Sequence, residues 1–412
     1  MKVIRVAALC CLVAGCAGIA SSSSGGSPTQ SNGAGGTSSG GAAGGSNATG
    51  GSGGSTLPPE TEVESSYEVP VATGRYIWVA NPDSGRVAYV AAATLEVHTV
   101  EAGNAPTYMS AIPSTTDDAV VVLNVLSQDA TILRVAPGGP LTKSTVSGLG
   151  AGANALTVSP DGGWVTAWTD ARAGAGADPL AGYQAVTLIN LGVTPPTKTI
   201  LSVGFRPVAV AYAADASTAF AITEDGVSVI DLTKSPPRVT GNVPLTNDPT
   251  ENADTRDVSI TPNGRLAVIR REGSASVGIV DLTTGTLGSI DLSGPVTDVD
   301  VTADGQSAVA VVRDTAEVAV IPLAAGIPDP SAVQHKTISG ETVGSASIAA
   351  DGKTVLLYTN AVATDRLTVL TLGALSYRVV KLHAPVLAVF ASADASSAVV
   401  FHSESAPAAS DG

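Results

Sequence analysis

A short pattern that recurs seven times along the chain constrains its fold most. Each copy has a β-branched run, then Asp or Asn among small or turn-forming residues, and then a second β-branched run. The central Asp or Asn residues lie 44, 54, 48, 41, 47 and 43 positions apart. Asp-Gly and Asn-Gly pairs are hairpin-turn signals, because glycine accepts a positive φ and Asp or Asn tolerates one. These turn residues are Asp117, Asp161, Asp215, Asn263, Asp304, Asp351 and Asp394.

Each repeat predicts four short strands, which we name A to D in chain order. In the clearest copy they cover 257–261, 266–270, 277–282 and 287–292, rich in Val, Ile and Thr and separated by Gly, Pro or Asp. No stretch after Glu64 shows a sustained helical period. Four strands at this spacing are typical of a propeller blade, since solenoid repeats are shorter or helical. The sequence therefore predicts an all-β fold, a seven-bladed β-propeller of four-stranded antiparallel blades.

Three segments resemble the YVTN-type β-propeller repeat. They are YIWVANPDSG at 76–85, GFRPVAV at 204–210 and VGIVDLTTG at 277–285. The resemblance covers about 75–405 and implies the propeller fold within a domain at 66–412. It implies no catalytic motif, because propellers carry many unrelated activities.

The two ends of the repeat array do not match. Runs of B, C and D type at 76–80, 87–91 and 95–100 precede the first turn residue, and the last repeat supplies only an A run at 386–391 and a B run at 397–401. Because the ends of a closed propeller commonly share one sheet, we expect the last A run to complete the first blade. The last B run then has no blade to belong to, so the C-terminus is either a natural polar tail or incomplete.

The N-terminus predicts a lipid anchor. Lys2 and Arg5 precede a short apolar run that ends in Leu12–Cys16, which resembles a bacterial lipobox, so residues 1–15 are interpreted as a lipoprotein signal peptide with Cys16 as the lipidated residue. Residues 6–14 are too few to span a bilayer, which needs roughly 20 apolar residues. Residues 16–65 read as a Gly/Ser-rich disordered tether, whose low-complexity part has an r.m.s. reach of roughly 30–36 Å.

Charge and cysteine content narrow the classes of partner. The chain has three cysteines, all within its first 16 residues, so the propeller has no disulfide or thiol catalyst. Without Lys2 and Arg5, 19 basic residues face 36 acidic ones, a net charge near −17. This balance argues against nucleic acid, which is bound through basic patches, and against charge-driven adhesion to anionic lipid. The predicted location is a bacterial cell envelope, either periplasm-facing or on the cell surface, with the membrane contacted through the lipid alone.

Candidate binding residues gather where the D→A and B→C loops lie, on one face of the propeller. Asp257 and Asp298 stand six residues before their turn residues, where the other five repeats have Ala or Ser. Two close carboxylates raise one pKa unless a cation or an arginine compensates, and Arg256 or Arg271 could do so. Arg313 lies in another B→C loop. The alternatives are a structural ion pair, a metal or cationic-ligand site, and carboxylates that point apart.

These observations favour a non-enzymatic binding module that takes a protein, peptide or small ligand at its loop-rich face. No cofactor is expected, although the carboxylates leave a bound divalent cation as an alternative. The rival interpretation is a lactonase- or lyase-like propeller enzyme that uses carboxylates and a metal at the channel mouth. A third is a structural envelope protein. The chain has no G-x-S-x-G, H-E-x-x-H or P-loop motif.

The anchor is directly testable. Because Cys16 is the one cysteine expected in the mature chain, Cys16→Ser should move the protein from the membrane fraction to the soluble fraction. The same substitution should abolish incorporation of radiolabelled palmitate. Membrane retention with unchanged labelling would contradict the lipoprotein interpretation.

Overall fold

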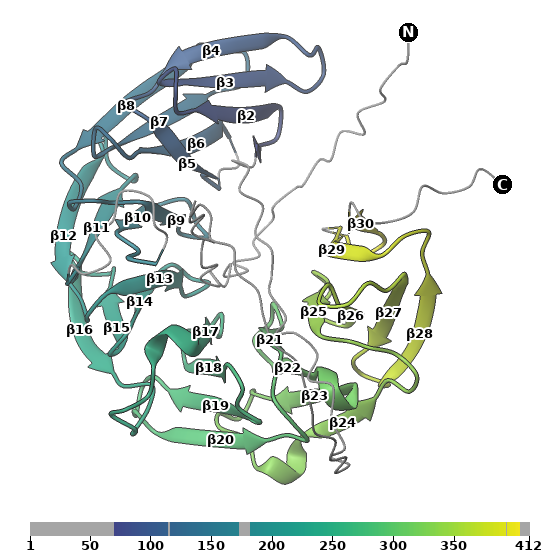
Figure 1. Cartoon of the computed structure of the whole chain (residues 1–412). Coiled ribbons are helices and arrows are strands. Elements are labelled where there is room, and N and C mark those ends of the chain that lie inside the picture. The colour runs from purple at the N-terminus through teal and green to yellow at the C-terminus, as the bar shows by residue number, and fades with distance from the viewer. Residues whose placement is uncertain (1–69, 114–115, 173–181, 393, 404–412) are drawn as a thin grey trace, which may run out of the picture.

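The computed structural model describes residues 70–113, 116–172, 182–392 and 394–403. These residues form seven four-stranded antiparallel sheets and one two-stranded sheet, arranged as blades around an axis (Figure 1). The predicted seven-bladed, all-β fold is confirmed. The predicted signal peptide, Cys16 and the predicted tether lie outside the described residues. Among the described residues, no helix has the length and apolar character needed to cross a bilayer.

The strands follow one another as simple meanders, with bounds as follows. Blade 1 contains β1 (Val71–Ala72), β2 (Tyr76–Asn81), β3 (Arg86–Ala91) and β4 (Val97–Glu101). Blade 2 contains β5 (Pro106–Ala111), β6 (Asp118–Asn124), β7 (Asp129–Val135) and β8 (Leu141–Ser147). Blade 3 contains β9 (Ala155–Val158), β10 (Trp164–Trp168), β11 (Ala185–Asn190) and β12 (Thr197–Ser202). Blade 4 contains β13 (Pro207–Tyr212), β14 (Thr218–Thr223), β15 (Gly226–Asp231) and β16 (Arg238–Val243).

The second half of the chain continues the pattern. Blade 5 contains β17 (Arg256–Ile260), β18 (Leu266–Arg271), β19 (Ser276–Asp281) and β20 (Leu287–Asp291). Blade 6 contains β21 (Asp298–Val301), β22 (Ser307–Val312), β23 (Glu317–Pro322) and β24 (Gln334–Thr337). Blade 7 contains β25 (Ser345–Ile348), β26 (Thr354–Tyr358), β27 (Arg366–Thr371) and β28 (Ser376–Lys381). The two-stranded sheet is β29 (Val386–Ala391) with β30 (Ala398–His402), and the short 3-10 helices are η1 (Ala253–Thr255), η2 (Arg313–Thr315) and η3 (Pro330–Ala332).

The repeated turn residue closes the A→B hairpin through its side chain. Asn263 Oδ1 accepts the backbone N–H of Arg265 at 3.0 Å, and Asp304 Oδ1 accepts that of Gln306 at 3.0 Å. The Thr302 hydroxyl donates to the same carboxylate at 2.6 Å, and these hydrogen bonds lower the pKa of Asp304. A short side chain with an oxygen at this position therefore fixes the turn, which explains why Asp or Asn recurs as the turn residue.

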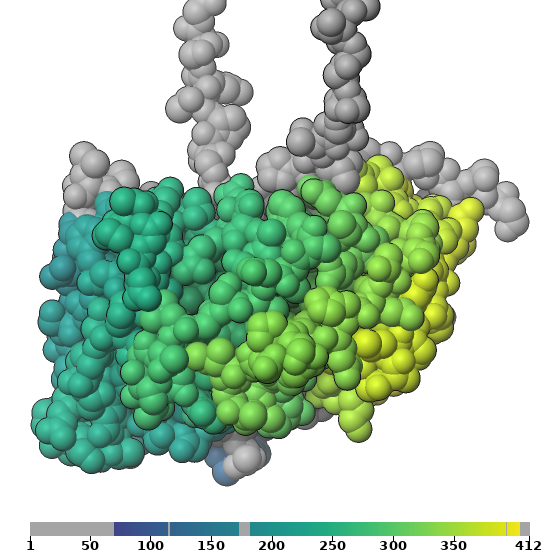
Figure 2. Space-filling view, turned by 90° about the horizontal axis from the view of Figure 1, so that it is seen from below, coloured from purple at the N-terminus to yellow at the C-terminus, as the bar shows by residue number. Residues whose placement is uncertain are grey.

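The core lies between blades rather than within one central mass. Side chains alternate along each strand, so Leu266 and Val268 of β18 pack against blade 6, while Ala267 and Ile269 pack against blade 4. Seven buried apolar clusters in the described residues fill the seven successive contacts from blade 1 to β29. Figure 2 shows the ring from its rim, where blades pack side by side from teal to yellow.

The ends of the ring differ from the prediction. We expected the run 386–391 to complete the first blade, and this is wrong: β29 pairs with β30, and β2 pairs instead with β1. β1 has two residues, Val71 opposite Trp78 and Ala72 opposite Ile77, so it is too short to show a strand pattern in the sequence. The last B run is β30, beside β29, and the described residues leave the ring open between this sheet and blade 1 (Figure 1).

The packing of β29 predicts two opposite outcomes for adjacent residues. Val389 is 3% exposed and packs against blade 7, whereas its neighbour Phe390 is 57% exposed. Val389→Asp should lower the free energy of unfolding by about 3 kcal/mol or more, because it buries an unpaired carboxylate. Phe390→Asp should cost less than about 1 kcal/mol. Urea unfolding followed by circular dichroism measures both, and equal losses would contradict the packing of β29 on blade 7.

Candidate functional site

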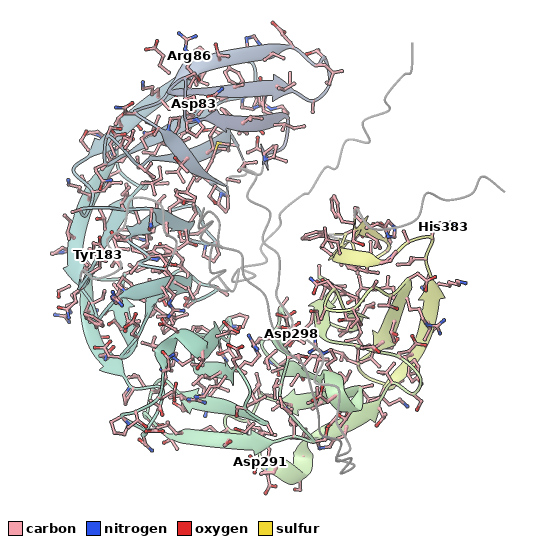
Figure 3. All side chains as sticks on the ribbon, viewed as in Figure 1. Asp83, Arg86, Tyr183, Asp291, Asp298 and His383 are labelled. Carbon is pink, nitrogen blue, oxygen red and sulfur yellow. The ribbon has the colours of Figure 1, made fainter. Side chains whose placement is uncertain are left out.

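All five candidate residues lie at the same face of the ring, which carries the D→A and B→C loops and which we call the loop face. Arg256 and Asp257 begin β17, and Asp298 begins β21. Arg271 ends β18, and Arg313 lies in η2 directly after β22. These positions follow from the meander, because A strands begin and B strands end at one side of every blade. Figure 3 shows Asp298 toward the centre of the ring.

The two aspartates bind different groups. Asp257 forms an ion pair with the guanidinium of Arg270, the residue directly opposite it on β18. Asp298 Oδ2 accepts the backbone N–H of Ala346 in blade 7 at 2.7 Å. Of the alternatives left open by the sequence, a structural ion pair describes Asp257, and its partner is Arg270 rather than Arg256 or Arg271. Asp298 instead ties the inner strands of two neighbouring blades together.

Arg256 and Arg271 converge on Glu251. Arg256 Nη1 lies 3.1 Å from Glu251 Oε1, and Arg271 Nε lies 2.9 Å from Glu251 Oε2. The Arg256 side chain is 4% exposed and that of Glu251 is 11% exposed. Burial lowers the pKa of Arg256 and Glu251 opposes this shift, so the arginine stays charged. The result is a buried Arg–Glu–Arg cluster at the start of blade 5.

The same cluster binds the neighbouring blade. Arg256 Nη2 donates to the backbone carbonyls of Thr223 at 3.0 Å and Glu224 at 2.8 Å, at the end of β14 and the start of the B→C loop of blade 4. Arg271 Nη2 donates to the carbonyl of Leu245 at 3.1 Å. The long D→A insert between β16 and β17 is therefore held to both blades at its two ends.

A second set of ion pairs extends the cluster to blade 3. Arg172, from the B→C insert after β10, lies 3.4 Å from Asp254, and Arg206 lies 3.5 Å from Glu224. Burial raises the pKa of Glu224, and the charge of Arg206 opposes the rise. We call the whole set the loop-face network. Its members are Asp170, Arg172, Arg206, Glu224, Glu251, Asp254, Arg256 and Arg271.

Asp170 is the most deeply buried carboxylate of this network. Its residue is 4% exposed, and burial raises the pKa of its carboxyl. The backbone N–H of Arg172 donates to its Oδ1 at 2.8 Å and opposes the rise, whereas nearby Asp254 adds to it. The network thus places four arginines beside four acidic residues, and its charges are matched within three adjacent blades.

The five candidate residues chosen from the sequence did not include Glu251, the centre of the network, or Arg270, the partner of Asp257. Glu251 lies in an insert that has no counterpart in other repeats, so no alignment of blades points to it. Arg270 could have been found, because it and Asp257 lie at equal distances from the A→B turn at Asn263 and Gly264. Among the described residues, no group of three or more His, Cys, Asp or Glu side chains is placed to hold a metal ion.

No protein-family model and no curated protein sequence matches the chain. Solved structures do. The dihydro-heme d1 dehydrogenase NirN is 17% identical, with a TM-score of 0.50 over 76% of this chain and 65% of that chain. Hydrazine synthase of Kuenenia stuttgartiensis is 15% identical, with a TM-score of 0.42, and the match covers 78% of this chain and 97% of that chain. A 6-phosphogluconolactonase-like protein of Bacteroides fragilis is 19% identical, with a TM-score of 0.39, and the match covers 66% of this chain and 82% of that chain.

Of these similarities, the one to NirN, with a TM-score of 0.50, bears on the fold and on nothing more. Identities this low transfer no site, and the chain spans 65% of the length of NirN. The chemistry of the loop face has to be argued from its own residues.

The burial of Arg256 predicts a stability difference between two acidic substitutions. Glu251→Ala should lower the free energy of unfolding by about 3–5 kcal/mol, because it leaves a buried guanidinium without its carboxylate. Asp254→Ala is the matched control, since the Asp254 side chain is 58% exposed and its pair with Arg172 should contribute at most about 1 kcal/mol. Denaturant unfolding measures both, and comparable losses would show that Glu251 is not the centre of the network.

Proposed function

We propose that this protein is a lipid-anchored, non-enzymatic binding module of the bacterial cell envelope. It binds a protein, peptide or small ligand through the loop face of blades 3, 4 and 5. The observation that carries the proposal is the loop-face network, in which ion pairs, the buried Arg256–Glu251 pair among them, connect loops from three neighbouring blades. Loops held by a rigid scaffold are the common way in which folds of this kind present a binding surface.

The network supports binding because it removes an entropic cost. Ordering a loop when a ligand arrives costs about 0.5–1.5 kcal/mol for each immobilised side chain. Here Arg256 and Arg271 already hold the 245–256 insert through both side-chain and backbone acceptors. The surface is therefore preorganised before any partner binds.

Charge indicates the chemistry of the partner. The network is balanced internally, but Asp248 and Glu272, which do not belong to it, are exposed on the same face. A rim of carboxylates favours a partner with a complementary basic surface and speeds its association. The strongly acidic chain also makes the lipid on Cys16, rather than surface charge, the means of membrane attachment in this proposal.

A capture experiment with two charge-reversed variants tests the loop face. Soluble residues 57–412 are immobilised, an envelope extract is passed over them, and bound proteins are identified by mass spectrometry. The double variant Asp248→Lys with Glu272→Lys should reduce recovery of the specific partner at least about tenfold, since each rim charge steers association.

The control is Glu96→Lys, which reverses an exposed charge in a C→D loop on the opposite face. It should capture the partner as the parent does. Equal capture by the double variant, or equal loss by the control, would contradict binding at the loop face.

A further inference from the structure

The D→A turn that leads into blade 4 has the same backbone as the turn that leads into blade 2. Both have the pattern Gly-x-x-Pro, at 103–106 and 204–207. In both, the residue before the proline has a left-handed φ, 53° at Ala105 and 49° at Arg206, and the register of the inner strand shifts directly after the proline. Each glycine is required, because a Cβ there would lie 2.6 Å or less from a neighbouring side chain.

The two middle side chains of this turn are free to differ, and in blade 4 they are large. Blade 2 has Asn104 and Ala105 at these positions, whereas blade 4 has Phe205 and Arg206. A left-handed φ is unfavourable for a bulky residue, so the turn itself does not select an arginine there. A strained residue that the local fold does not need is a reason to look for a function at that place.

The backbone of Phe205 is held in one position while its side chain stays accessible. Its N–H donates to Asp225 Oδ1 at 2.9 Å, and its carbonyl accepts the N–H of Glu224 at 2.8 Å. One edge of the ring lies near Gly182, where a Cβ would be 3.1 Å from Cε2. Phe205 is nevertheless 36% exposed. An accessible ring on a fixed backbone binds a ligand at a low cost in ordering.

The charges beside this ring favour a cationic ligand. The guanidinium of Arg206 lies over the ring, 5.4 Å from its centroid, so the ring already contacts one guanidinium. Arg206 has Glu224 as its partner at 3.5 Å. Asp225 is exposed, and no basic side chain in the described part of the chain forms an ion pair with it. One carboxylate at the base of the ring therefore has no matching charge from these residues.

The free oxygen of this carboxylate is Oδ2. The N–H of Phe205 and the hydroxyl of Thr223, at 2.6 Å, both donate to Asp225 Oδ1. Since Oδ1 holds the turn, Oδ2 is the atom that a ligand can reach without disturbing the loop.

We propose that Phe205 and Asp225 bind an arginine side chain of the partner. Its guanidinium stacks on the exposed part of the Phe205 ring and donates to Asp225 Oδ2. Arginine suits the site better than lysine, because a planar guanidinium both stacks on an aromatic ring and pairs with a carboxylate. The assignment rests on the proposed function, since it names the chemistry of the partner at the loop face.

Fluorine NMR with a defined peptide tests the arginine site. The full chain, carrying Cys16→Ser, is labelled with 4-fluorophenylalanine, and its four phenylalanines give four signals. Phe220 is buried, and Phe390 and Phe401 belong to β29 and β30, away from blade 4. A peptide of repeated Gly-Ser-Arg should move the Phe205 signal until it saturates and leave the other three unchanged.

Two substitutions each remove half of the site. Phe205→Asn introduces the residue that the same turn has in blade 2, so the fold should be kept, and the missing signal assigns Phe205. Asp225→Asn keeps the oxygen that holds the turn and removes the charge. Each should weaken binding of the arginine peptide about three- to fivefold in calorimetry. Leu126→Asn, which alters a residue 72% exposed in a loop of blade 2, is the matched control and should bind as the parent does.

Two further peptides test the choice of arginine. Citrulline in place of arginine keeps the planar head without its charge, and lysine keeps the charge without the plane. Both peptides should bind at least about threefold more weakly than the arginine peptide. Equal binding of either peptide overturns the arginine site. So does a Phe205 signal that does not move, or an equal loss of binding in Leu126→Asn.

The capture experiment separates the arginine site from the proposed function. If the envelope partner is lost in the Asp248→Lys, Glu272→Lys variant but retained by Phe205→Asn, the arginine site is overturned and binding at the loop face stands. Equal capture by the charge-reversed variant contradicts the loop-face function itself, whatever the peptides do.

Discussion

Face-to-face packing between neighbouring blades is the interaction on which the rest of the structure depends. Each strand places alternate side chains on opposite faces, so one blade such as blade 5 supplies apolar residues to two interfaces at once. At roughly 25 cal/mol for each Å² of apolar surface removed from water, these interfaces supply most of the favourable free energy of folding. No blade buries both of its faces alone, which is why the strands can be short and the helices few.

The geometry of the loop-face network depends on this packing. Arg256 reaches the carbonyls of Thr223 and Glu224 because blades 4 and 5 are held in register by the apolar cluster below them. Buried ion pairs often contribute little net stability, since desolvation offsets their attraction. Their more evident effect here is positional: they define one arrangement of loops that would otherwise have many.

The sequence contained enough to place the blades but not to close the ring. The repeated Asp and Asn residues identified the blades because six of the seven make the same hydrogen bond, in which the side chain accepts the backbone N–H two residues later. The loops contain no hydrogen bond that recurs from blade to blade. Glu251 lies in an insert that no other repeat has, so comparison of the repeats could not predict its role. β1 was missed because a two-residue strand has no periodicity, and the expected closure by the 386–391 run failed with it.

An open ring has two end sheets, and these should be the first parts of the molecule to unfold under tension. Within the described residues, blade 1 and the β29–β30 sheet each pack against one neighbouring blade, as the terminal units of a linear repeat array do. Such arrays fray from their ends, because terminal units have one interface to lose instead of two. A pull transmitted through the N-terminal segment would load β1 first, and β1 pairs with β2 through two residues. Under tension the propeller should unzip from blade 1, while the blades of the loop-face network yield later.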